Sequence, residues 1–172
     1  MINQVELANI AEQVKVLMDR LGLERRECEL PAIEFYSSVE HGLPLNFAVY
    51  SPVTHTIYIN SDAKDLIEEN EGALEEIIAH ELTHAFQNLP ATVLTDVFSD
   101  DYWTQRHEQE AYAIGTLWQA VYGICANHPV GDNQTLAQWH EEFINTTPLE
   151  LVLNHYVNLA RDSFLEQTAR TV

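Results

Sequence analysis

The sequence is poor in basic residues. Only 8 lysines and arginines stand against 27 aspartates and glutamates, which gives the 172-residue chain a formal net charge of −19 at pH 7. A surface this acidic repels nucleic-acid phosphates and anionic membranes, so we expect no nucleic-acid partner and no membrane partner. Two interpretations of the acidity remain. It keeps the protein soluble, or the protein imitates nucleic acid and sequesters a basic partner.

Cysteine and long apolar runs are also scarce. The two cysteines, Cys28 and Cys125, form no CxxC pair, which argues against a thiolate zinc site, and whether they pair with each other stays open. Charged residues interrupt the first twenty positions from Glu6 onward, so we expect no signal peptide. No apolar run approaches the ~20 residues that a membrane span needs. These absences predict a cytoplasmic protein with reduced thiols.

The first third of the chain changes from a helical to a strand-like pattern. Apolar residues at helical spacing predict a helix over 2–21 that ends at Gly22. Segments 32–37, 46–51 and 54–60 are rich in β-branched and aromatic residues and are separated by glycine and proline. This pattern predicts three strands joined by short turns, most simply an antiparallel meander.

The rest of the chain has helical spacing. We expect a short helix capped by Ser61 or Asp62, a helix capped by Asn70, and three further helices over 102–125, 134–145 and 148–167. The intervening segments 88–101 and 127–133 read as loops. The fold class predicted is α+β, in a single domain over 1–172. Its parts are an N-terminal helix (1–22), a sheet (31–60), a helical pair (71–125) and C-terminal helices (134–167).

Residues 80–84 read HELTH, an HExxH pattern. Residues four apart on a helix are neighbours, so His80 and His84 can both reach one cation at the zinc–nitrogen distance of about 2.0 to 2.1 Å. Glu81 lies on the same side but is rotated away from the imidazoles, which favours a place beside a zinc-bound water. Zinc lowers the pKa of such a water to about 7, and a carboxylate can take its proton during attack on a carbonyl. The pattern predicts Glu81 as the general base, although two histidines can also sit on an ordinary helix.

A catalytic zinc site needs a third protein ligand, and the helix over 102–125 offers two candidates. Glu108 shares a face with Ala111 and Gly115, whose small side chains would let this helix approach the HELTH helix closely. The apolar face of the same helix, extended backward, passes nearer Glu110. From the residues alone, both Glu108 and Glu110 stay open as the third ligand.

HELTH followed by E-x-x-A, from Glu108 to Ala111, resembles the gluzincin clan of zinc metallopeptidases, especially its minimal single-domain members. The resemblance covers about residues 54–115. It implies a hydrolase that cuts peptide bonds and holds one Zn²⁺ per chain through His80, His84 and Glu108. The partner that it implies is a peptide or protein substrate; the sequence identifies no protein regulator.

The resemblance also implies a substrate strand and an oxyanion donor. In this clan an extended peptide pairs with an edge strand beside the active-site helix, and the candidates here are Thr56, Ile57 and Tyr58. Related enzymes add a Tyr or His that stabilises the oxyanion, and His155 and Tyr156 are adjacent candidates on the last helix. Other possible donors are Tyr102, His107, Tyr112, His128 and His140.

The chain departs from the clan pattern at one position. Many members carry an aspartate directly after the alanine, where it orients a ligand histidine, but this chain has Tyr112 there. The partner of the histidines therefore stays unidentified. Two alternative functions stay open. The scaffold can bind zinc as a non-catalytic regulatory or interaction domain, or the protein can be an acidic decoy, which predicts no metal.

Overall fold

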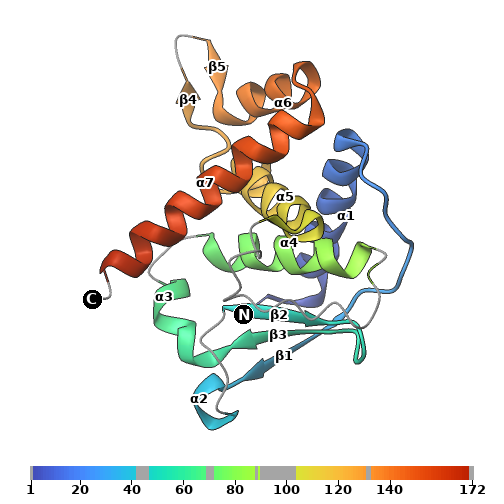
Figure 1. Ribbon diagram of the computed structural model, residues 1–172, viewed down its shortest axis with the longest axis vertical. Coiled ribbons are helices and arrows are strands. Elements are labelled where there is room, and N and C mark those ends of the chain that lie inside the picture. The colour runs from blue at the N-terminus through green and yellow to red at the C-terminus, as the bar shows by residue number, and fades with distance from the viewer. Residues whose placement is uncertain are drawn as a thin grey trace.

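The longer helices gather on one side of a small sheet in the computed structural model of the protein (Figure 1). The structure describes residues 2–41, 47–68, 72–87, 89, 104–130 and 133–170. The expected α+β fold class is confirmed. The elements are α1 (Gln4–Leu21), β1 (Ala32–Tyr36), α2 (Ser38–His41), β2 (Ala48–Ser51), β3 (Thr56–Asn60), η1 (Ser61–Ala63), α3 (Lys64–Glu68), α4 (Ala73–Phe86), α5 (Arg106–Tyr122), β4 (Pro129–Val130), β5 (Gln134–Thr135), α6 (Leu136–Thr146) and α7 (Leu149–Arg170).

The sheet is mixed, with the strand order β1–β3–β2. β2 runs antiparallel to β3, as expected, but β1 runs parallel to it, so the meander is wrong for the first strand. A meander needs a tight hairpin between its first two strands. Here α2 begins two residues after β1 ends, and the chain reaches the far side of β3 before it forms β2. Consequently β3 is the central strand, and β1 and β2 flank it.

The first helix begins and ends where the sequence indicates. Asn3 caps α1: its side chain accepts from the backbone N–H of Glu6, and the Glu6 side chain accepts in return from the N–H of Asn3. Such a capping box satisfies two N–H groups that the first turn leaves unpaired. Gly22 ends the helix with φ at 68°, a left-handed conformation that favours glycine.

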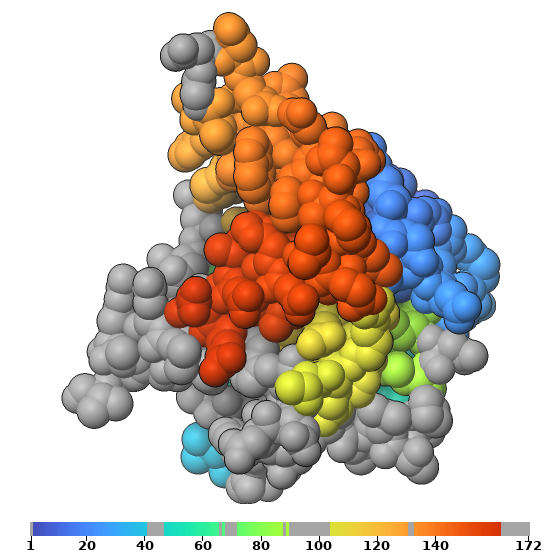
Figure 2. All heavy atoms as spheres, turned by 45° about the horizontal axis from the view of Figure 1, so that its top comes forward, coloured from blue at the N-terminus to red at the C-terminus, as the bar shows by residue number. Residues whose placement is uncertain are grey.

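Helices α4 and α5 form the centre of the core. Ile78, Leu82 and Phe86 on α4 are completely buried, as are Ile114 and Leu117 on α5. Burial of one such side chain contributes roughly 1.5 to 3 kcal/mol, so these faces hold the two helices together. Figure 2 shows α7 lying across α5 at the surface, with α6 above it and α1 beside α6.

Several expected features lie outside the described residues or differ from expectation. Asn70, the expected cap of α4, and most of the loop over 88–101 lie outside the described residues, and Gly72 precedes the first turn of α4. Asn60, rather than Ser61 or Asp62, caps the short helical segment after β3. Within the expected loop 127–133 the chain starts a small antiparallel pair, β4 with β5. Two-residue strands are too short for periodicity to reveal.

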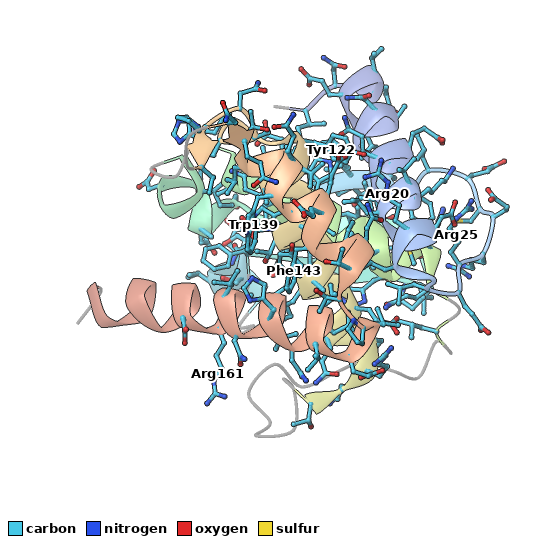
Figure 3. The ribbon with its side chains drawn as sticks, turned by 90° about the horizontal axis from the view of Figure 1, so that it is seen from above. Arg20, Arg25, Tyr122, Trp139, Phe143 and Arg161 are labelled. Carbon is cyan, nitrogen blue, oxygen red and sulfur yellow. The ribbon has the colours of Figure 1, made fainter. Side chains whose placement is uncertain are left out.

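The junction of α6 and α7 is an aromatic cluster. Trp139 and Phe143 stack with their ring centroids 5.4 Å apart, and both are labelled on α6 in Figure 3. The Nδ1 atom of His140 lies 2.6 Å from the hydroxyl of Tyr156, which is completely buried. The ring of His155 contacts Phe143 at 4.9 Å. This cluster joins the last two helices.

The structure bears on two expectations that follow from the scarcity of cysteines and of long apolar runs. Cys28 and Cys125 are both free thiols, which answers the question of their pairing. Across the described residues, we find no helix that combines enough length with enough apolar character to cross a membrane.

His140 predicts a pH-dependent stability. Burial, with a smaller effect from His155, lowers the pKa of His140 from 6.5 to about 4. The unfolded chain therefore takes up a proton at higher pH than the folded chain does. Stability should be full above pH 6.5 and fall, by up to about 3 kcal/mol from this residue, as the pH decreases toward 4.

Urea unfolding of the wild type and of His140→Asn at pH 7, 5.5 and 4.5 checks this. The variant should lose part of the dependence of its unfolding free energy on pH. His128→Asn, which replaces an exposed histidine, should keep the wild-type dependence. Equal slopes for the wild type and His140→Asn would contradict the expectation.

Candidate metal centre

Gly115 sets the distance between α4 and α5. A methyl group at this position would lie 3.2 Å from the carbonyl oxygen of Glu76 and 3.3 Å from Cβ of His80. Both distances are shorter than ordinary van der Waals contacts, so any larger residue would push the helices apart. Ala111, one turn earlier, is completely buried. The close approach that the small residues predict is confirmed.

Three ligand atoms converge between the two helices. The Nε2 atoms of His80 and His84 lie 3.2 Å apart, and Oε2 of Glu108 lies 3.6 Å and 3.4 Å from them. The three side chains offer ligand atoms within 4.8 Å of one another, so this group can hold a metal ion. Glu108 is 3 % exposed and His84 is 9 % exposed, which keeps bulk water from competing for these atoms.

The electrostatics of the group favour positive charge at its centre. Burial opposes a charged His84, but Glu108 outweighs burial and raises the pKa of His84 to about 9. Burial likewise works against a charged Glu108, but His80 and His84 hold the pKa of that carboxyl well below its usual range. A carboxylate that stabilises a proton on a neighbouring imidazole stabilises a metal cation by the same interaction.

Glu110, the rival ligand, lies outside the group. Its Oε1 accepts from Nε of Arg106 at 2.7 Å, and its Oε2 accepts from Nε2 of Gln87 at 3.0 Å. Glu110 does lie on the side of α5 that the apolar pattern indicates, but it contacts Arg106 and Gln87 and not the two histidines. Nη1 of Arg106 also donates to Glu150 on α7, at 2.9 Å and 3.0 Å, which fixes the arginine from a third element.

Gln87 is the residue that the sequence did not reveal. It is buried at the end of α4, and its Oε1 lies 2.9 Å from Nδ1 of His84. Its Nε2 donates to the carbonyl oxygen of His107 and to Glu110, each at 3.0 Å. The one signal available was its position three residues after His84, which puts the two side chains on the same face of a helix.

Glu81 lies beside the three ligands but contacts the sheet. It is 6 % exposed, and its Oε2 accepts a hydrogen bond from the backbone N–H of Tyr50 at 2.7 Å. Arg26 strengthens the same junction, because Nε donates to the carbonyl oxygen of Ala85 on α4 and Nη2 donates to the Tyr50 hydroxyl. The candidate base is thus anchored to β2.

The strand predicted to lie at the edge of the sheet is its central strand. Thr56, Ile57 and Tyr58 belong to β3, which pairs with β1 on one side and β2 on the other, so its backbone groups are used within the sheet. The edge strand beside α4 is β2 (Figure 1). The error follows from the assumed meander, which would have left the last strand at the edge.

Five of the seven candidate oxyanion donors fall into two groups. His155 and Tyr156 belong to the α6–α7 aromatic cluster, together with His140. His107 and Tyr112 do contact the ligands. Nε2 of His107 lies 3.5 Å from Oε1 of Glu108, and the Tyr112 ring lies 4.4 Å from that of His80. The remaining two are His128, which is exposed, and Tyr102, which lies outside the described residues.

A cavity of about 690 Å³ borders Gln87, His107 and Glu110. Arg26 and Arg106 also line it, whereas the three ligand residues are not among the described residues of its wall. The cavity therefore borders the residues that support the ligands.

Comparisons with models of protein families, with curated proteins and with solved structures found no match to this chain.

Metal content should distinguish the two candidate ligands. Glu108→Ala removes one of three converging donors and should reduce zinc binding to well below one ion per chain. Glu110→Ala should retain far more zinc than Glu108→Ala, because it removes none of the three donors: this carboxylate contacts Arg106 and Gln87 instead. Elemental analysis after zinc loading and dialysis measures both. Loss of zinc in Glu110→Ala but not in Glu108→Ala would identify Glu110 as the third ligand.

Gly115→Ala should weaken zinc binding by about tenfold, a loss typical of displaced ligands, because the added methyl group separates Glu108 from the histidines. Gly22→Ala is the matched control. It forces a side chain into a left-handed conformation, which costs about 1 to 2 kcal/mol of stability, but nothing lies within 4 Å of the new atom. Competition with a chelator measures affinity. Equal affinities for the two variants would contradict the role of Gly115.

Proposed function

We propose that the protein is a zinc-dependent metallopeptidase, in which His80, His84 and Glu108 hold the metal and Glu81 is the general base. The observation that carries the proposal is the convergence of three donors with a further buried carboxylate beside them. Peptide hydrolysis by the gluzincin type of mechanism needs these groups and this arrangement. The resemblance of HELTH and E-x-x-A to that clan supports the same assignment.

The set of donors suits zinc. Two imidazole nitrogens and one carboxylate oxygen are ligands that zinc uses in catalytic sites, which take three protein ligands, whereas structural sites usually take four. Harder cations such as magnesium and calcium prefer oxygen alone. When bound, zinc would act as a Lewis acid that activates water and polarises the carbonyl of the scissile peptide bond.

Glu81 would move the proton. The N–H of Tyr50 holds Oε2 in place, so the carboxylate has one fixed oxygen and one oxygen left for proton transfer. Glu81 would take the proton of the attacking water and deliver it to the nitrogen of the leaving amine. A general base positioned in this way contributes about 10² to 10⁴ to the rate.

The outer edge of β2 would bind the peptide. The N–H of Asn60 donates to the carbonyl of Phe47, which means that residue 47 faces β3. Backbone groups alternate along an antiparallel strand, so Ala48 and Tyr50 direct theirs away from β3. The Tyr50 N–H holds Glu81. The carbonyls of Ala48 and Tyr50 and the N–H of Ala48 would pair with an extended substrate, largely independent of its sequence.

Glu81→Gln tests the proposal. The variant keeps the shape and an acceptor for the Tyr50 N–H, so it should bind zinc like the wild type and lose at least about 10²-fold in kcat/KM. Glu75→Gln, on the first turn of the same helix, should keep full activity. The measurement is mass spectrometry of a mixed peptide library incubated with each zinc-loaded protein.

The outcome separates the alternatives. Cleavage by the wild type and Glu75→Gln but not by Glu81→Gln supports the mechanism. Equal cleavage by all three proteins would rule out Glu81 as the base. Stoichiometric zinc with no cleavage of any library peptide would favour a zinc-binding interaction domain, and no zinc binding at all would favour the acidic decoy.

A further inference from the structure

The surroundings of Gln87 leave one orientation for its amide. The carbonyl oxygen of His107 and the carboxylate of Glu110 both accept hydrogen bonds and lie 3.0 Å from the same end of the amide. Only an NH₂ group can satisfy two acceptors, so Nε2 must be at this end. Oε1 must therefore face His84.

This orientation determines which nitrogen of His84 carries a proton. Oε1 of Gln87 is an acceptor only, and it lies 2.9 Å from Nδ1 of His84, so Nδ1 must be the N–H donor. In the neutral ring the other nitrogen, Nε2, then has a free electron pair. Nε2 is the atom that lies 3.2 Å from Nε2 of His80 and 3.4 Å from Glu108. A neutral His84 ring, the form that binds a metal, thus directs its electron pair to the centre of the group.

A charged pair holds the amide in this orientation. Arg106 donates to Glu110 at 2.7 Å and is itself held by Glu150 on α7, so the carboxylate that receives Nε2 is fixed in place. Rotation of the amide by 180° would bring Oε1 against a carboxylate and a carbonyl, with no hydrogen to share. The chain Glu150–Arg106–Glu110–Gln87–His84 therefore reaches from α7 to the ligand group without a break.

We infer that Gln87 is a positioning residue that fixes the tautomer and the ring orientation of His84, and that Glu110 and Arg106 act through it. An amide thus orients His84, whereas Tyr112, at the position where many clan members carry an aspartate, lies against the other histidine, His80. This role also explains why a partly buried Glu110 follows Glu108 on the same helix without belonging to the ligand set. The inference concerns the metal site of the proposed function and does not require that the protein hydrolyse peptides.

The test compares Gln87→Leu with the wild type and with two further variants. Gln87→Leu keeps the volume and removes the acceptor. The exchanged variant Gln87→Glu with Glu110→Gln restores an acceptor for Nδ1 and a donor between the two side chains, and leaves only the carbonyl of His107 without its donor. Gln134→Leu is the matched control, because this glutamine also donates to a glutamate, Glu142, but on β5 and α6.

Two measurements are made on zinc-loaded protein, and neither depends on turnover. Nitrogen-15 NMR of the imidazoles reports which nitrogen binds zinc and whether the Nδ1 proton of His84 is protected from exchange with water. Chelator competition gives the zinc affinity. The wild type, the exchanged variant and Gln134→Leu should show Nε2 bound and a protected Nδ1 proton. Gln87→Leu should lose that protection and bind zinc about 10- to 100-fold more weakly.

Each outcome of these measurements either supports or overturns the role inferred for Gln87. Loss in Gln87→Leu with recovery in the exchanged variant supports the inference, even if the protein cleaves no peptide. A protected proton and wild-type affinity in Gln87→Leu would overturn it. Equal weakening in Gln87→Leu and the exchanged variant would also overturn it, because packing alone would then account for the loss. If the zinc-loaded protein cleaves peptides, an outcome that overturns the role of Gln87 leaves the proposed function unaffected.

Discussion

The contact between α4 and α5 at Gly115 is the constraint on which the site depends. Two helices normally keep their axes 8 to 10 Å apart, at a distance set by the side chains between them. A glycine opposite His80 allows the close approach at which a carboxylate on one helix reaches imidazoles on the other. The core residues of both helices supply the energy for this contact, while Glu108 and His84 are buried, and His80 partly buried, as a consequence.

The support of the site extends outward from this contact in two directions. On one side, Gln87 connects His84 to Glu110, Arg106 and α7. On the other side, Glu81 and Arg26 connect α4 to β2. A ligand group held from both sides is rigid before any cation arrives, which reduces the conformational entropy lost on binding. In an acidic chain, Arg106 also supplies positive charge beside the partly buried carboxylate of Glu110.

Local pattern predicted the parts of the fold that local interactions determine. The helical period and the Gly22 stop predicted α1, and the histidine spacing indicated two members of the ligand group, while only the E-x-x-A resemblance favoured Glu108 over Glu110. The parallel pairing of β1 with β3 was not predictable in this way, because it depends on which distant strands meet. The mistaken choice of Thr56, Ile57 and Tyr58 followed from that error. Gln87 was missed for a different reason: an amide has no distinctive spacing, and its role depends on what its two ends contact.

The hydrogen bond between Glu81 and Tyr50 has a consequence for how the protein behaves in solution. An edge strand with unpaired N–H groups is a template for pairing with other chains and a starting point for aggregation. The buried carboxyl group of Glu81 occupies one of these N–H groups, so the proposed catalytic base also protects the edge of the sheet. Replacement by alanine would remove both the base and this protection. An inactive form made with glutamine should remain monodisperse at concentrations where the alanine form self-associates.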